Sequence, residues 1–201
     1  MKAVQIITLP LIVLSSISQQ SCSLKDDIIL LPLQPQNYFP TKVGSEWVYI
    51  VTNGVDSIER SVLVIDSLRW ISGTYFRWVV QDSTSTDTFY ITTYKDTIKK
   101  YFDLNNHWPP QIEYILPIHI DGVWQWSFPC GTGKVLHRDT VAVQAGVFHN
   151  IYQIQYEWDC YNDHTIEVRW VDPEIGVIKI SKKGLRTEEN WELKRYTIPG
   201  I

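Results

Sequence analysis

The chain has 201 residues and a formal net charge of −4 at pH 7, and 20% of its residues are charged. This mildly acidic balance argues against nucleic-acid binding, because a basic face supplies most of the affinity for a phosphate backbone. Nine Trp and eleven Tyr residues against one Met are typical of a chain rich in β-strands.

The N-terminal segment has the pattern of an export signal. Lys2 is followed by an apolar run over residues 3–17 that is interrupted by polar residues and by Pro10. This run is too short to cross a bilayer as a helix, which needs roughly 20 apolar residues. We therefore predict a signal peptide over residues 1–21, which is removed from the mature protein.

Cys22 follows this run, after Ser21 and before a Lys-Asp-Asp sequence at 25–27. The stretch resembles the lipobox of bacterial lipoproteins, with Gln19 and Ser21 where a typical lipobox has Leu and Ala or Gly. The resemblance implies that Cys22 becomes the first residue and carries acyl chains, including palmitate. Several acyl chains hold a protein stably on a membrane. Residues 25–27 resemble the signal for the outer face of the outer membrane.

The next segment, residues 22–37, is predicted to be the lipidated cysteine and a tether. Pro32 and Pro35 exclude a regular helix there, although residues 28–33 are unusually apolar for a linker. These apolar residues either pack on the domain or lie near the membrane. Residues 38–201 are predicted to form a single antiparallel β domain, in keeping with the usual length of one domain.

Strand and turn signals alternate along this domain. Pro40 and Gly44 predict a corner before the first strand, and Asn53-Gly54 is a hairpin signal. Period-two alternation over residues 147–158 predicts an antiparallel sheet with one solvated face. The same pattern over residues 166–170 places Glu167 and Arg169 on the polar face. About eleven strands are predicted, over residues 46–52, 57–66, 75–81, 88–94, 97–102, 123–128, 134–144, 147–158, 166–170, 177–182 and 190–198.

Residues 104–117 interrupt this pattern. Pro110 suits the first position of a helix, so we expect a short helix over residues 111–116. The sequence predicts at most this one helix in the domain.

Several turn and core motifs of the domain resemble those of a family of uncharacterised bacterial outer-membrane lipoproteins. The motifs are Tyr38-Phe39-Pro40 with Val43-Gly44 and Trp47-x-Tyr49, Val141-x-x-x-Ala145-Gly146-x-Phe148, Trp170 with Gly176-Val177-Ile178-Lys179, and Glu192-Leu193-x-x-Tyr196. Related folds are the half-barrel lipoprotein carriers, in which a curved antiparallel sheet covers an apolar interior. The resemblance implies an all-β fold with a strongly curved sheet, a half-barrel or barrel. Because the chain offers so little helix to plug a half-barrel, a two-sheet β-sandwich is the alternative.

Two cysteines remain beyond Cys22, and they favour a disulfide. Cys130 and Cys160 form an even pair in a protein predicted to be exported. The bridge would close a loop of about 30 residues and contribute roughly 2–4 kcal/mol. The alternative is two separate thiols. Neither cysteine has the neighbours of a zinc site.

No set of residues predicts a catalytic centre or a metal site. His137 and Asp139 share a strand face, but two ligands are too few, and an exposed polar face explains both. A dyad of Cys160 with His164 would require a free thiol, which the predicted disulfide would remove. We therefore predict a protein without enzymatic activity, cofactor or metal.

The surplus of aromatic residues is the stronger functional signal. Most of these side chains are expected in the core, because large aromatic residues bury the most apolar surface. Trp124 and Trp126 share a strand face, as do Tyr156 and Trp158. These four residues are candidates for lining an acyl-chain cavity or a platform for a sugar ring.

Together these features predict an exported, membrane-anchored, non-catalytic lipoprotein of the cell envelope. The resemblance to half-barrel lipoproteins implies a binding or carrier module for a hydrophobic or amphipathic ligand. The alternatives are a structural or interaction subunit with an envelope protein partner, and a surface lipoprotein that binds a glycan. The expected location is the outer membrane, on its periplasmic or outer face; the alternative is a soluble periplasmic protein.

Overall fold

The computed structural model describes residues 40–200, apart from residues 71, 106–107, 161–162 and 186. The predicted signal peptide, Cys22, the tether and the first two residues of the predicted domain lie outside the described residues. The described part of the chain is all-β, as predicted, and is made of twelve strands. It contains no apolar helix of the length that crosses a bilayer.

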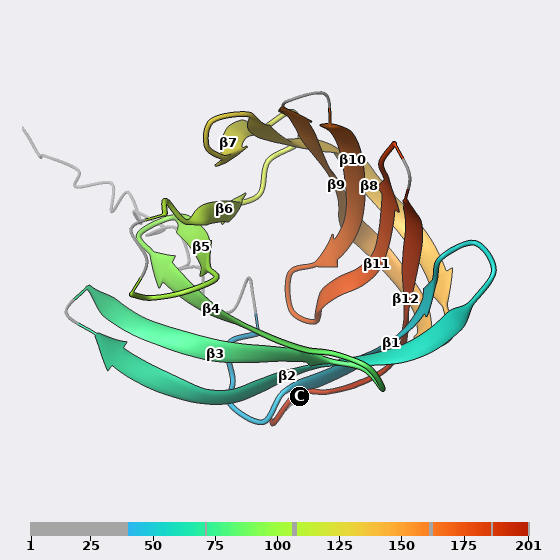
Figure 1. Ribbon diagram of the computed structural model, residues 1–201, viewed down its shortest axis with the longest axis horizontal. Coiled ribbons are helices and arrows are strands. Elements are labelled where there is room, and N and C mark those ends of the chain that lie inside the picture. The colour runs from blue at the N-terminus through green and yellow to red at the C-terminus, as the bar shows by residue number, and fades with distance from the viewer. Residues whose placement is uncertain (1–39, 71, 106–107, 161–162, 186, 201) are drawn as a thin grey trace, which may run out of the picture. The chain divides into compact units, whose positions relative to one another are not determined.

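The strands form one antiparallel sheet (Figure 1). The first six are β1 (Glu46–Thr52), β2 (Ser57–Trp70), β3 (Gly73–Gln81), β4 (Thr86–Tyr94), β5 (Thr97–Tyr101) and β6 (Gln111–Ile115). The second six are β7 (Val123–Ser127), β8 (Gly131–Val143), β9 (Gly146–Cys160), β10 (Asp163–Asp172), β11 (Gly176–Lys183) and β12 (Glu188–Thr197).

The sheet is a meander that rolls into a nearly closed barrel. Its strand order is β6-β5-β4-β3-β2-β1-β12-β11-β10-β9-β8-β7, so the first and last strands of the chain pair in the middle. The two edges, β6 and β7, follow one another in the chain and have Cα atoms within 8 Å of each other (Figure 1). They form no ladder, so the barrel opens at this seam. A rolled sheet of this kind leaves few unpaired strand edges.

Side chains connect the sheet across the seam. The indole Nε1 of Trp124 on β7 donates to the carbonyl of Ile112 on β6 over 2.8 Å. The hydroxyl of Tyr156 on β9 donates to the carbonyl of Glu113, also over 2.8 Å. Arg169 on β10 pairs with the carboxylate of Glu113. Strand β6 is therefore attached to the far half of the barrel through buried polar contacts.

The prediction of a helix over residues 111–116 is wrong, because this segment is strand β6. Tyr114 pairs with Ile98, and Gln111 pairs with Lys100, along the free edge of β5. A helix of this length is marginal by itself, whereas the edge of β5 offers a complete ladder. Pro110 precedes the strand, where its missing N–H costs no ladder bond. This segment accounts for the difference between twelve observed and about eleven predicted strands.

The core lies inside the barrel and begins at the predicted corner. Gly44 has a φ of +88°, a conformation that favours glycine, and the strand after it turns Trp47 and Tyr49 inward. The Trp47 indole donates to the carbonyl of Ile175 over 2.7 Å, and the Tyr49 hydroxyl donates to that of Val177 over 2.8 Å. The first strand thus fixes the turn between β10 and β11 from inside.

Candidate functional site

A cavity of about 140 Å³ lies inside the barrel, and we call it the inner cavity. An engineered apolar cavity of about 150 Å³ binds benzene, so this space suits one ring or a short stretch of alkyl chain. It is too small for a whole diacyl lipid. Its lining residues are Trp47, Tyr49, Val62, Trp78, Val80, Phe89, Ile91, Lys100, Glu113, Tyr114, Arg169, Gly176, Val177, Ile180 and Trp191.

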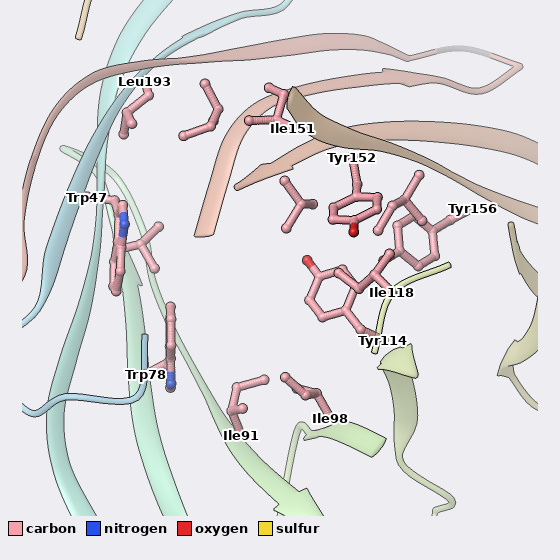
Figure 2. Packing of buried hydrophobic residues seen from close by; sticks show 14 of the residues in the cluster. Trp47, Trp78, Ile91, Ile98, Tyr114, Ile118, Ile151, Tyr152, Tyr156 and Leu193 are labelled. Carbon is pink, nitrogen blue, oxygen red and sulfur yellow. The ribbon is translucent and has the colours of Figure 1, made fainter. Parts of the chain in front are cut away.

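One wall of the inner cavity is aromatic. The rings of Trp47 and Trp78 stack with centroids 5.0 Å apart and planes 8° from parallel. Phe89 continues the stack, with its centroid 5.9 Å from that of Trp78. Figure 2 shows Trp47 and Trp78 on one side of the core and Tyr114 and Tyr156 on the other. Such ring faces pack well against an apolar ring or chain.

The opposite wall is charged. Arg169 pairs with both Glu113 and Glu167, and these three side chains are 11%, 5% and 13% exposed. Its guanidinium carbon lies 4.3 Å from the ring centroid of Tyr156. Burial opposes the charge on Arg169, but the two carboxylates outweigh it and hold the pKa of Arg169 well above its usual value. Burial also raises the pKa of Tyr114 to about 12, so its hydroxyl stays neutral.

The inward direction of Arg169 and Glu167 corrects the sequence prediction. The alternation on β10 placed these residues on a solvated face. In the structure Arg169 is buried, while Val168 and Trp170 on the other face are half-exposed. Alternation separates the two faces of a strand but does not tell which one is interior when the interior carries a salt bridge.

Lys100 lies between the aromatic and charged parts of the site. Its ammonium nitrogen is 4.3 Å from the ring centroid of Phe89 and 4.9 Å from that of Phe102. No carboxylate among the described residues lies within 4 Å of this nitrogen. Burial lowers the pKa of Lys100, because the charged amine loses water there.

A second depression, the rim hollow, meets the inner cavity at Lys100. It has a volume of about 210 Å³ and carries three exposed aromatic side chains, those of Phe102, Trp108 and Phe128. Trp158 also lines it. The rim hollow lies beside the open seam, because its residues flank β6 and follow β7. The seam therefore offers an aromatic approach to Lys100.

A third depression, the side hollow, contains three of the four predicted ligand-binding residues. Trp126, Tyr156 and Trp158 line this space of about 240 Å³ together with Glu167 and Lys182. The centroids of Trp126 and Tyr156 are 5.1 Å apart. Their role in binding a ligand stays a prediction.

The fourth predicted residue, Trp124, has a structural position. Its buried ring lies over Gly133, where an added Cβ would come 2.5 Å from the ring, and its Nε1 is bonded to β6. Glycine at 133 therefore allows the indole to lie flat on β8. Trp124 lines none of the three depressions described above.

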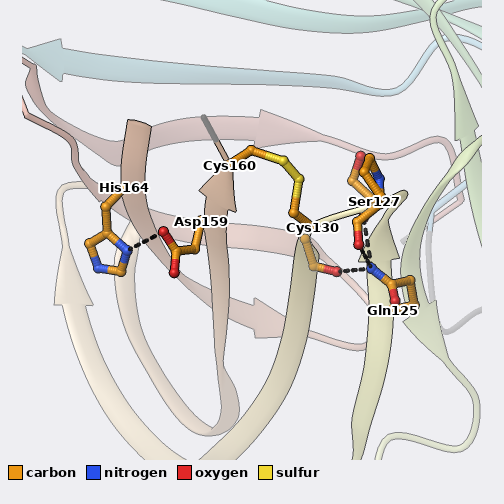
Figure 3. Close-up of a disulfide and its surroundings, with 8 residues drawn as sticks. Gln125, Ser127, Cys130, Asp159, Cys160 and His164 are labelled. Atoms are coloured by element: carbon orange, nitrogen blue, oxygen red, sulfur yellow. Dashed lines mark hydrogen bonds and ion pairs between the residues drawn. A yellow bond between two sulfur atoms is a disulfide. The ribbon is translucent and has the colours of Figure 1, made fainter. Parts of the chain in front are cut away.

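Cys130 and Cys160 are joined in a disulfide, with Cα atoms 5.7 Å apart (Figure 3). The bridge connects the residue before β8 to the end of β9. It occupies the thiol that a dyad of Cys160 with His164 would require. The His164 ring instead lies 3.9 Å from the exposed carboxylate of Asp159. The described residues contain no group of three or more metal-ligating side chains.

Sequence reasoning missed the charged half of the site. Glu113 lay in the segment predicted to be a helix, and Lys100 had no distinguishing motif. The available signal was the pair of charged residues, Glu167 and Arg169, that alternates with apolar residues over 166–171. Their partner is supplied by β6, 56 positions away from Arg169 in the chain. No local pattern connects them.

The sequence matches no protein-family model. No curated protein sequence matches it either. Two bacterial proteins are among the solved structures that share the fold. One is a candidate exported protein of Bacteroides fragilis with a YmcC-like fold, with a TM-score of 0.56 and 10% identity, covering 80% of this chain and 99% of that one.

The other is a candidate lipoprotein of Parabacteroides distasonis, with a TM-score of 0.51 and 10% identity, covering 80% of this chain and 98% of that one. At this identity the likeness concerns the fold alone. The described barrel therefore has the fold of these two bacterial proteins.

Proposed function

We propose that the protein is an exported, lipid-anchored binding module that takes the apolar part of an amphipathic envelope molecule into the barrel. The inner cavity carries this proposal, because its stacked aromatic wall offers an apolar surface inside a rigid sheet. Ligand sites are typically concave and mostly apolar, with a few polar groups that fix orientation. The proposed module is non-catalytic, as binding alone requires no catalytic group.

The proposal of export and lipidation rests on the N-terminal sequence. The signal-like run and Cys22 support an acylated N-terminus, palmitate included, and the fold is shared with a candidate exported protein and a candidate lipoprotein. A disulfide between Cys130 and Cys160 suits an oxidising compartment. The outer membrane is the proposed location.

Removal of the acylation site tests the anchor. The variant Cys22→Ser is expected to leave the membrane fraction and appear in the soluble periplasmic or secreted fraction, because the acyl chains supply the membrane affinity. Fractionation and immunoblotting measure this. A Cys22→Ser protein that stays with membranes after a high-salt wash would contradict the anchor.

Filling the inner cavity tests the binding site. The half-buried side chain of Val80 lines this cavity, so Val80→Trp is expected to weaken binding of 1-decanol at least tenfold. Four buried methylenes contribute roughly 3 kcal/mol, so their exclusion is large enough to measure. Calorimetric titration is made on the chain from residue 22 with Cys22→Ser, so that no acyl chain of its own competes.

The matched control is Val123→Trp, because Val123 is 60% exposed and lies outside the inner cavity. It is expected to bind decanol like the parent protein. Far-UV circular dichroism checks that both variants are folded, and Val80→Phe replaces Val80→Trp if the larger ring prevents folding. Equal binding by the Val80 and Val123 variants would place the ligand elsewhere.

The rim hollow favours a second candidate function, glycan binding. Trp108 is 76% exposed, and Asp103 and Gln111 provide polar groups beside it. An exposed indole with polar neighbours suits a sugar ring. Trp108→Ala is expected to abolish binding in a glycan array while leaving decanol binding unchanged, if this function is the correct one.

A further inference from the structure

Three charged side chains line the inner cavity, those of Lys100, Glu113 and Arg169. Glu167 adds a second carboxylate next to them through its pair with Arg169. Arg169 engages both carboxylates directly. Glu113, the carboxylate that lines the inner cavity, is therefore held by Arg169 and not by Lys100.

Lys100 is the cation of the inner cavity that has no carboxylate within 4 Å among the described residues. Its close contacts are the rings of Phe89 and Phe102, which attract an ammonium group but do not neutralise it. Lys100 pairs in register with Ile91, which lines the inner cavity, so its side chain stands on the interior face of β5. A charge in this position costs desolvation free energy unless a counter-charge accompanies it.

Lys100 lies where the inner cavity and the rim hollow meet. It lines both the inner cavity and the rim hollow, with Phe89 on one side and Phe102 on the other. An amphiphile whose apolar end fills the inner cavity from the seam would leave its polar end at this junction. The junction presents an ammonium group within an aromatic surface.

We propose that the ligand of the inner cavity is an amphipathic anion, with a single chain or ring in the cavity and a carboxylate or phosphate-type head group paired with Lys100. This inference rests on the proposed function and adds the chemical class of the ligand. It makes the head group, as well as the tail, a determinant of binding.

Two ligands with the same chain separate the contributions of tail and head group. Decanoate and 1-decanol are titrated into the chain from residue 22 with Cys22→Ser, with and without Lys100→Met. The parent protein is expected to bind decanoate at least tenfold more tightly than decanol. Lys100→Met keeps the apolar stem but removes the charge, so it is expected to lose the preference for decanoate over decanol.

Four controls support the comparison. Lys100→Arg keeps the charge and is expected to retain the preference, whereas Lys134→Met removes an exposed lysine that lines none of the three depressions and is expected to change nothing. Thermal unfolding verifies that Lys100→Met is folded. Acetate, which lacks the chain, is expected not to bind measurably.

The outcomes distinguish this inference from the proposed function. Equal affinity for decanoate and decanol in the parent protein, or a preference that survives Lys100→Met, would overturn the assignment of Lys100 while leaving an apolar binding module. Failure of both ligands to bind the parent protein would overturn the proposed function itself.

Discussion

Replacing Arg169 by Met is expected to destabilise the barrel by about 3–5 kcal/mol, the usual cost of removing one partner from a buried ion pair. The substitution leaves the carboxylates of Glu113 and Glu167 buried without their cation, and their side chains are only 5% and 13% exposed. It also separates β6 from β10 at the seam. Urea unfolding followed by circular dichroism gives the free energy of unfolding.

The loss in free energy of unfolding caused by Arg169→Met is expected to depend on pH. In the parent protein burial favours protonation of Glu167, but Arg169 outweighs burial and holds the pKa of Glu167 below its usual value. The stability that ionised Glu167 contributes by pairing with Arg169 is therefore complete above a pH of about 4.3. It is lost as the pH falls through the lowered pKa of Glu167. In the variant, burial of Glu167 is opposed only by the charges of Lys182 and Lys100 and favours its neutral form more strongly, so acidification from pH 7 to pH 4 should reduce the loss of stability.

The control for this prediction is an exposed ion pair of the same chemistry. Arg77 and Asp66 pair on the surface, and each side chain is 38% exposed. Arg77→Met is expected to cost about 0–1 kcal/mol, because water already solvates both charges. If Arg169→Met were no more destabilising than Arg77→Met, the buried network would not hold the seam together.

Replacing Trp47 by Ala is expected to destabilise the domain by about 3–5 kcal/mol, the range observed when a large buried aromatic is truncated. Trp47 is 1% exposed, stacks on Trp78, and donates to the carbonyl of Ile175. The variant loses the ring contacts, enlarges the inner cavity and leaves that carbonyl without its donor. Urea unfolding measures the loss.

Trp70→Ala is the matched control, because Trp70 is 51% exposed near the end of β2. Its effect is expected to stay within about 0.5 kcal/mol, as for most surface substitutions. Most single substitutions destabilise a protein by about 1 kcal/mol. A loss in free energy of unfolding below that value for Trp47→Ala would show that the aromatic wall does not support the core.

The fold was largely predictable because its signals are local. The corner at Gly44 and the hairpins at Asn53-Gly54 and Gly146 depend on residues that adopt positive φ or form tight turns. Alternation along β9 likewise identified Ile154 and Tyr156 as interior residues, and both are fully buried. Each of these features depends on neighbours in sequence.

The features that were predicted wrongly or missed depend on contacts between segments that are distant in the chain. The segment of β6 takes its structure from the edge of β5, so its own propensities were insufficient to distinguish a strand from a helix. The inward direction of Arg169 depends on Glu113, which β6 supplies. Lys100 becomes notable only when the barrel places it between Phe89 and Phe102. The sequence thus predicted the sheet but not the charged half of its interior.

The most direct test of the account is native mass spectrometry of the chain from residue 22 with Cys22→Ser, produced by export and purified without detergent. Lipid extraction of the same sample identifies any bound molecule. We predict a stoichiometric added mass that extracts as a single-chain amphiphile and disappears in Val80→Trp. A parent protein that shows only its own mass, both as purified and after incubation with an extract of envelope lipids, would contradict the claim that the barrel binds such a ligand.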